Sequence, residues 1–367
     1  MTELVPAVRA PAALAGLTPE AAELLAAAQA ERDDTFTDEA ADLISRGLAD
    51  NTTAAYRRIA RDYQKWCEST GRTALPASEA TLANYVAHLA ATPTAKGQPR
   101  APGSIDQAIA CILAMHDHAR APKPGTKAAR LALRAYRKQH TAAGHRKKKA
   151  PPITLPILRQ MIAALPADTP IGVRDRALLV LAFALMGRRS ELAALDISDI
   201  VFTDDGLEVY IAMSKTDQDA AGETIPIPYG SHRETCPVRT VRAWLDLLAE
   251  HGVTTGALLR PIDKNSRIGG AVYPDGGRAA RGTGQRMTPH GINYRVKLAA
   301  VAAELPNASA YSAHGLRAGG ATSAAKSGAP MSAITAHGRW VDGSPVVAGY
   351  IRQVDRWSEN PMRGVGL

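Results

Sequence analysis

The chain has 367 residues and a mass of 38.8 kDa, and its 46% hydrophobic and 22% charged residues are typical of a globular protein and exclude disorder throughout. This length exceeds what one hydrophobic core usually supports, so we expect two domains. The longest apolar run, Ala177 to Met186, has ten residues, whereas a membrane helix needs about 20. No secretory signal pattern opens the chain. The three cysteines are far apart without metal-type spacing, as expected for reduced thiols in a cytoplasm.

Charge is distributed unevenly along the chain. The net charge is +9 and the pI is near 9.5. Residues 1–50 contain 3 basic and 10 acidic side chains, and the rest of the chain contains 41 basic and 25 acidic ones. A basic body behind an acidic leader indicates a polyanionic partner, of which nucleic acid is the most common.

The first half of the chain predicts a helical domain. Residues 1–35 are rich in alanine and proline and are expected to be a mobile acidic leader. Residues 36–143 have helical patterns, beginning with a helix whose N-cap is expected at Asn51 and Thr52. Apolar residues there recur at helical spacing (Tyr56, Ile59, Tyr63, Trp66 and Cys67), and further helices are predicted over Ser78–Ala91, Gly103–Arg120 and Thr126–Ala143.

A basic linker, residues 144–152, separates this domain from a second one, residues 153–367. Its four consecutive cations, Arg146, Lys147, Lys148 and Lys149, precede two prolines, and they would lie well against phosphates. The second domain predicts a mainly α fold with a small antiparallel sheet. Its helices are expected over Asp175–Met186, Pro237–His251, Thr288–Leu305, His314–Gly328 and Met331–His337, and its strands over Asp196–Val201, Leu207–Met213 and Thr224–Pro228.

Several kinds of site are absent or weakly indicated in the sequence. There is no GxxxxGK[ST], GxGxxG, HExxH or GxSxG motif. His116 and His118 point to different helix faces, so a surface or core-edge pair is favoured over a metal site. The glycine-rich residues 269–284 predict a flexible surface loop. No metal and no nucleotide cofactor is therefore expected.

What remains is an ordered series of cations that ends in a tyrosine. Arg188 follows an apolar helix and has Glu191 three residues later, and Lys215 stands at the predicted hairpin turn. His314 and Arg317 share one helix face at i and i+3. Gly338-Arg339-Trp340 comes next, followed by Gly349-Tyr350-Ile351-Arg352 near the C-terminus.

This order resembles the tyrosine recombinases, also called the phage integrase family, and within it the Cre-like branch. The Gly-Arg-Trp segment is similar to a "GGW"-like motif and the tyrosine segment to an "NYIR"-like motif, and the resemblance covers about residues 40–360. It implies a C-shaped two-domain DNA clamp, with a SAM-like core-binding domain over residues 36–143 and a catalytic domain over residues 153–367. Two departures are a Trp340-to-Tyr350 interval one residue longer than the pattern and a short tail containing proline and glycine.

The resemblance also implies roles for these residues. Tyr350 would be the nucleophile that forms a 3′-phosphotyrosyl intermediate, while Arg188 and Arg317 would bind the phosphate oxygens. Lys215 would protonate the leaving oxygen, and His314 would hydrogen-bond the phosphate or accept the tyrosine proton. Trp340 would donate its indole N–H to a phosphate oxygen, with Glu191 supporting the site. Competing assignments are Arg189 for Arg188, a core role for Trp340 with His337 in its place, and Tyr229, Tyr294 or Tyr311 as nucleophile.

The expected partner is double-stranded DNA with an inverted-repeat target site, bound by a homo-tetramer on two sites. The polar side of Thr288–Leu305 is the predicted major-groove surface, formed by His290, Asn293, Arg295 and Lys297. The expected setting is the cytoplasm, with a bacterial or phage origin. Two alternatives stay open: a catalytically silent DNA-binding regulator of the same fold, and a type IB topoisomerase or resolvase-like enzyme.

Overall fold

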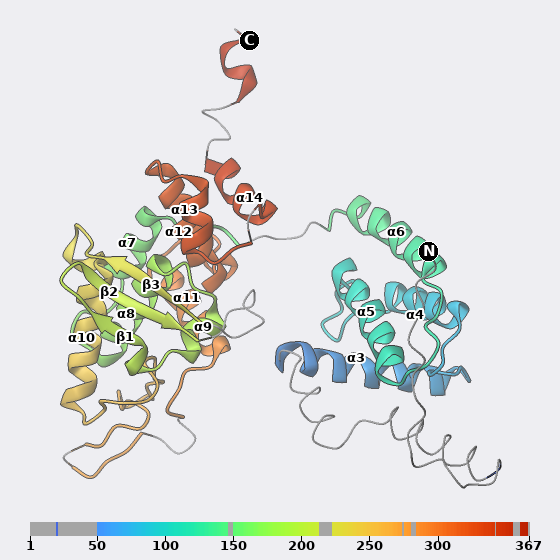
Figure 1. Cartoon of the computed structure of the whole chain (residues 1–367), viewed down its shortest axis with the longest axis horizontal. Coiled ribbons are helices and arrows are strands. Elements are labelled where there is room, and N and C mark those ends of the chain that lie inside the picture. The colour runs from blue at the N-terminus through green and yellow to red at the C-terminus, as the bar shows by residue number, and fades with distance from the viewer. Residues whose placement is uncertain are drawn as a thin grey trace, which may run out of the picture. The chain divides into compact units, whose positions relative to one another are not determined.

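The computed structural model describes residue 20 and residues 50–145, 150–212, 222–273, 275–279, 284–341, 343–354 and 360–365. The chain divides into two compact units, Met1–Lys147 and Lys148–Leu367 (Figure 1). The fold is mainly helical with one small antiparallel sheet, which confirms the predicted class. The predicted leader, apart from Glu20, and the cations Arg146 to Lys149 lie outside the described residues.

The first unit packs four described helices around an apolar core. They are α3 (Asp50–Ser69), α4 (Glu79–Ala91), α5 (Pro102–His118) and α6 (Lys127–Ala142). Ser78 caps α4 by accepting a hydrogen bond from the Thr81 N–H, and Pro102 opens α5, where a missing N–H costs nothing. Asn51 and Thr52 lie inside α3 instead of at its N-cap. The core contains Tyr63, Leu82, Ile105, Ile109 and Leu133.

His116 is a fully buried core histidine of this unit, and not the surface or core-edge residue that the sequence suggested. Its Nε2 accepts a hydrogen bond from the Ala77 N–H at 2.8 Å, so its Nδ1 is free to donate to the Ile112 carbonyl at 2.7 Å. The side chain therefore joins α5 to the turn before α4. His118 is exposed, as the opposite helix face requires.

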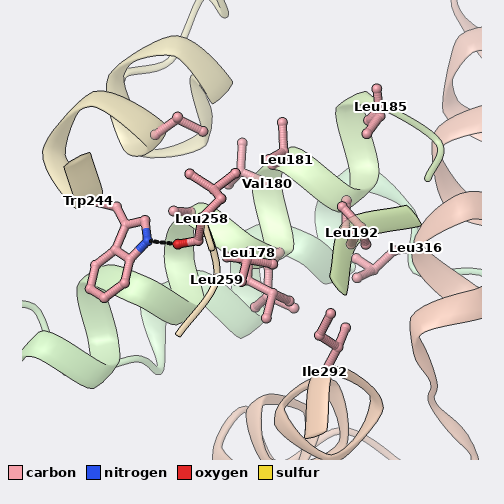
Figure 2. Close-up of a cluster of buried hydrophobic side chains, with 14 of the residues drawn as sticks. Leu178, Val180, Leu181, Leu185, Leu192, Trp244, Leu258, Leu259, Ile292 and Leu316 are labelled. Carbon is pink, nitrogen blue, oxygen red and sulfur yellow. Dashed lines mark hydrogen bonds between the residues drawn. The ribbon is translucent and has the colours of Figure 1, made fainter. Parts of the chain in front are cut away.

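The second unit is built around α8 (Pro170–Ala184), which is buried on nearly all sides. The hydrophobic core of this unit is a cluster of buried side chains, and Figure 2 shows Leu178, Val180 and Leu181 of α8 in its middle. Trp244 is fully buried beside them and donates its indole N–H to the Leu258 carbonyl at 2.8 Å. The other helices are α7 (Leu155–Ala163), α9 (Arg189–Ala194), α10 (Pro237–Glu250), α11 (Pro289–Ala302), α12 (Ala313–Lys326), α13 (Met331–His337) and α14 (Pro345–Val354), with 3-10 turns over Ile197–Asp199, Arg233–Thr235, Ala308–Ala310 and Pro361–Gly364.

The sheet contains β1 (Ile200–Phe202), β2 (Gly206–Ile211) and β3 (Glu223–Pro228) in the order β1-β2-β3, with both pairs antiparallel. The expected strand over Asp196–Val201 starts late, because Asp196 and Asp199 form a reciprocal cap around a 3-10 turn. In β3, Pro226 pairs with Glu208 and Pro228 with Gly206. Since proline has no N–H, these are positions where the β3 backbone faces away from β2.

The glycine-rich segment is not simply a flexible surface loop. Ile268 and Ala271 are buried in the core, and the Gly269 carbonyl accepts a hydrogen bond from the buried Arg260. Tyr273 accepts the Ile268 N–H at 2.7 Å. Residues 274 and 280–283 lie outside the described residues.

Helix α12 lies against two backbone segments because it has glycine at the contacts. The Ile153 N–H donates to the Gly315 carbonyl at 2.8 Å, so the chain is fastened to α12 just after the basic linker. A Cβ on Gly319 would lie 1.8 Å from the Ile153 carbonyl oxygen, and one on Gly320 would lie 2.5 Å from the Phe183 carbonyl oxygen. Only glycine permits these approaches.

Candidate active site

The site begins where α8 ends and the chain turns out of the core. Arg188 is the N-cap residue of α9, and Glu191 stands at the third helical position. The carboxylate of Glu191 accepts hydrogen bonds from the Arg188 backbone N–H at 2.8 Å and from Arg188 Nη1 at 2.6 Å. Glu191 is almost fully buried, whereas the Arg188 side chain is 20% exposed. The local fold therefore directs one guanidinium toward solvent.

The first turn of α12 contributes His314 and Arg317. Asn293 of α11 accepts a hydrogen bond from the Ala313 N–H at 3.0 Å, which fixes the start of this helix. Arg317 is buried and donates to two carbonyl oxygens, those of Met186 and of Gly338. It thereby joins the end of α8 to the turn after α13.

The turn that follows α13 contributes Gly338, Arg339 and Trp340 to the site. Arg339 has a φ of +55°, and its carbonyl accepts a hydrogen bond from Arg188 Nη2 at 3.4 Å. The Arg317 guanidinium lies 3.9 Å from the centroid of the Trp340 ring, a cation–π contact. A Cβ on Gly338 would lie 1.7 Å from that ring. Trp340 thus packs in a place that a larger residue at position 338 would close.

Helix α14 presents Tyr350 to these groups. The Tyr350 hydroxyl is 2.8 Å from His314 Nε2, and its ring meets the Trp340 ring edge-on at 6.2 Å between centroids. Val347, one turn earlier, is buried with Met186, Ala321 and Ile334. This apolar contact holds α14 in the position at which Tyr350 lies beside His314 and Trp340.

Burial and charge set the protonation of these groups. Burial and the neighbouring Arg188 lower the pKa of Arg317 to about 9. Loss of solvent, Arg317 and Arg188 lower the pKa of His314, so its imidazole is neutral at pH 7. Burial would raise the pKa of Glu191, but Arg339 and Arg188 outweigh it and keep the carboxyl ionised. Burial raises the pKa of Tyr350, opposed by Arg317.

A buried cluster of arginines beside a tyrosine is an arrangement suited to phosphoryl transfer. The model of the phage integrase family matches residues 157–356, which include every residue of this cluster. The chain belongs to the phage integrase family. It is thus a tyrosine-type site-specific recombinase or integrase, an enzyme of DNA strand exchange.

Two curated members of this family are similar in sequence. An integrase/recombinase XerD homolog of Selenomonas ruminantium is 33% identical over 66% of this chain and 68% of its own length. The Cre recombinase of Escherichia phage P1 is 25% identical over 84% of this chain and 86% of its own length.

Solved structures of other proteins share the fold of this chain. The Tn1549 transposon integrase in complex with transposon right-end DNA has a TM-score of 0.52 at 12% identity, covering 84% of this chain and 92% of that one. XerH recombinase bound to its difH substrate has a TM-score of 0.51 at 11% identity, covering 87% and 82%. At these identities the likeness is one of fold.

The structure brings together Arg188, Glu191, His314, Arg317, Trp340 and Tyr350. Lys215 lies outside the described residues. Of the competitors, Arg189 is exposed, and His337 Nε2 contacts the Ala184 carbonyl at 2.7 Å. Tyr311 is buried in the core, while Tyr229 and Tyr294 are exposed on other elements. The geometry favours Tyr350 over these three tyrosines.

Helix α11 uses two of the four polar residues predicted to face DNA for contacts within the protein. Asn293 is engaged with α12, and Arg295 binds the buried carboxylate of Asp175, with its Nε 2.8 Å from Oδ2. Both side chains therefore hold helices together, a role that competes with reading DNA bases. His290 is exposed and Lys297 half-exposed, so both are accessible from solvent.

Two rows of cations in the first unit escaped the sequence analysis. Exposed basic residues, most of them three or four positions apart, lie on α6 and on α3, opposite the buried faces of these helices. That spacing was the available signal. The rows are Lys127, Arg130, Arg134, Arg137 and Lys138 on α6, and Arg57, Arg58, Arg61 and Lys65 on α3.

The described residues contain no group of three or more His, Cys, Asp or Glu that could hold a metal ion. Within the same residues, no helix is long and apolar enough to cross a membrane.

Proposed function

We propose that this protein cuts and rejoins DNA at a specific site through a 3′-phosphotyrosyl bond on Tyr350, without metal or ATP. The observation that supports this most directly is the 2.8 Å contact between the Tyr350 hydroxyl and His314 Nε2, beside the buried Arg317. The arrangement places a phenol next to a neutral base and a buried cation. Those are the two things a weak oxygen nucleophile needs.

In the proposed step, Tyr350 Oη attacks the scissile phosphorus and its proton passes to His314 Nε2. The bond from phosphorus to O5′ breaks, and Lys215 gives its proton to the leaving oxygen. Arg188 and Arg317 hold the non-bridging oxygens, with planar guanidiniums that match two oxygens each. Reversal with a different 5′ hydroxyl rejoins the strand, so no external energy source is consumed.

We further propose that both units bind duplex DNA. The cation rows on α3 and α6 and the linker residues Arg146 to Lys149 are suited to phosphate contacts. An inverted-repeat target, a homo-tetramer on two sites and a Cre-like reaction follow from the resemblance, and the 25% identity to Cre over 84% of this chain supports them. The 33% identity to a XerD homolog makes a Xer-like reaction the competing form.

The test is to trap covalent adducts with SDS in cells that express wild type or Tyr350→Phe, and to sequence the attached DNA. We expect an adduct with wild type and none with Tyr350→Phe. Tyr294→Phe, an exposed tyrosine elsewhere on the same unit, is the matched control and should keep the adduct. Absence of any adduct, with DNA binding intact, would refute the proposal in favour of a catalytically silent regulator.

The recovered sites separate the remaining alternatives. A recombinase gives products in which two copies of the recovered site have exchanged strands. A topoisomerase-like enzyme relaxes supercoiled DNA carrying one site and exchanges nothing.

A further inference from the structure

Arg339 is a buried arginine that none of the proposed chemical steps uses. Its side chain is 2% exposed, and its backbone is in the left-handed region, which arginine seldom adopts. Its Nη2 donates to Glu191 Oε2 at 2.9 Å, and its Nη1 donates to the His337 carbonyl at 3.2 Å. A disfavoured backbone and a buried charge persist together only where the surrounding contacts compensate for both.

Glu191 is shared between two arginines. Its Oε1 accepts from Arg188 Nη1, whereas its Oε2 accepts from the Arg188 backbone N–H and from Arg339 Nη2. Arg317 contacts carbonyl oxygens and an indole ring. Two guanidiniums thus share the charge of one carboxylate, and with the neighbouring guanidinium of Arg317 the group carries a formal surplus of two positive charges. That surplus matches the two negative charges of the pentacoordinate phosphorus during nucleophilic substitution.

We infer that Arg339 is a positioning residue, which divides the charge of Glu191 and so keeps Arg188 positive toward the scissile phosphate. Without Arg339, the carboxylate would pair with Arg188 alone and neutralise it. The carbonyl of Arg339, which accepts a hydrogen bond from Arg188 Nη2, also fixes the orientation of the Arg188 fork. This inference rests on the proposed function, because it assigns the phosphate as the ligand of Arg188.

The experiment compares wild type with Arg339→Met, Arg339→Lys and the double variant Glu191→Gln/Arg339→Met. The exposed Arg159 on α7 gives the matched control Arg159→Met. Two quantities are measured: the single-turnover rate of adduct formation on saturating duplex recovered from wild-type adducts, and the affinity of DNA-free protein for inorganic phosphate by calorimetry. Thermal unfolding checks that each variant is folded.

We expect Arg339→Met to slow adduct formation about 100-fold, the scale of losing one preorganised charge contact, while its Kd for the duplex changes less than about threefold. Its affinity for phosphate should fall only about tenfold, because the positive charge of the site stabilises a ground-state phosphate less than it stabilises the transition state. Arg339→Lys keeps the charge and should recover about tenfold of the lost rate. The double variant should also be about tenfold faster than Arg339→Met, because glutamine cannot neutralise Arg188.

A purely structural role predicts the opposite order. If Arg339→Lys is as slow as Arg339→Met and the double variant is slower still, the inference is overturned. Should Arg339→Met fail to fold, Arg339→Lys compared with wild type decides: a loss of about tenfold upholds the inference, and a loss of about 100-fold or more overturns it. If wild type forms no adduct, the proposed function fails, and phosphate titration then decides the inference: equal affinities, or no binding by wild type, overturn it, while a loss in Arg339→Met upholds it.

Discussion

Replacing Gly319 by alanine tests how α12, the helix that carries His314 and Arg317, is held in place. A Cβ at this position would lie 1.8 Å from the Ile153 carbonyl oxygen and 2.3 Å from its carbonyl carbon. Both contacts are far inside van der Waals distance, and the clashing atoms are backbone, so α12 or residues 151–153 must move by about 1 Å or more. Overpacking costs up to about 3 kcal/mol and loss of the Ile153-to-Gly315 hydrogen bond about 1 kcal/mol.

The better helix propensity of alanine returns about 1 kcal/mol, so the net loss is about 3 kcal/mol. For a unit of this size, that lowers Tm by about 6 to 12 °C. The same displacement moves His314 and Arg317, and a misplacement of about 1 Å can cost about 100-fold in rate.

The assay is thermal unfolding of the full chain together with the rate of adduct formation. Gly103 in α5 provides the control, since a Cβ there has no heavy atom within 4 Å and its φ is not positive. Gly103→Ala should keep Tm and activity or raise Tm slightly. If Gly319→Ala behaves like Gly103→Ala, the close approach of Ile153 to α12 does not hold the helix in place, and the reasoning is wrong.

Three further predictions follow from groups already described. The lowered pKa of His314 places its protonation below pH 6.5, so adduct formation should fall below that pH. Above it the rate should stay constant until Arg317 begins to lose its proton near its pKa of about 9, and His314→Gln should remove the acidic limb while lowering the rate. Asp175→Asn leaves Arg174 and Arg295 without their carboxylate and should lower the free energy of unfolding by about 3 to 5 kcal/mol in a denaturant titration. The control Asp106→Asn, in an exposed pair with Arg137, should lower it by at most about 1 kcal/mol. Equal losses would contradict the assignment of a buried network around Asp175. His116→Phe leaves the Ala77 N–H without its partner and removes the side-chain hydrogen bond to the Ile112 carbonyl, and it should cost about 2 to 4 kcal/mol. His118→Phe should stay within about 0.5 kcal/mol, so similar Tm values for the two variants would exclude the bridging role of His116.

The elements with strong local patterns were predictable from the sequence. The apolar run from Ala177 and the segment with His314 and Arg317 at i and i+3 both form helices as predicted, although α8 begins at Pro170, before the predicted start at Asp175. By contrast, the strand expected from Asp196 starts at Ile200, because two aspartates cap each other over a 3-10 turn. Hydropathy does not reveal such side-chain hydrogen bonds.

In the site, too, some residues could be predicted from sequence motifs and others could not. Arg188 and Tyr350 stand in motifs that can be read residue by residue, and the structure brings them together with Arg317. Nothing in the sequence distinguished Arg339 from a surface arginine, because its importance comes from burial against Glu191, more than a hundred residues away. Likewise Arg295 looked like a free cation on a polar helix face, and only the position of α8 shows that Asp175 holds it.

The two prolines of β3 affect how the edge of the sheet can pair with a strand of another molecule. Every exposed sheet edge is a template on which a strand of another molecule can add, and repetition of that event leads to aggregates. Pro226 and Pro228 remove two donors from the outward side of β3, so a foreign strand laid along this edge finds gaps in its hydrogen bonding. The β3 edge of the sheet is therefore a poor template for a strand of another molecule.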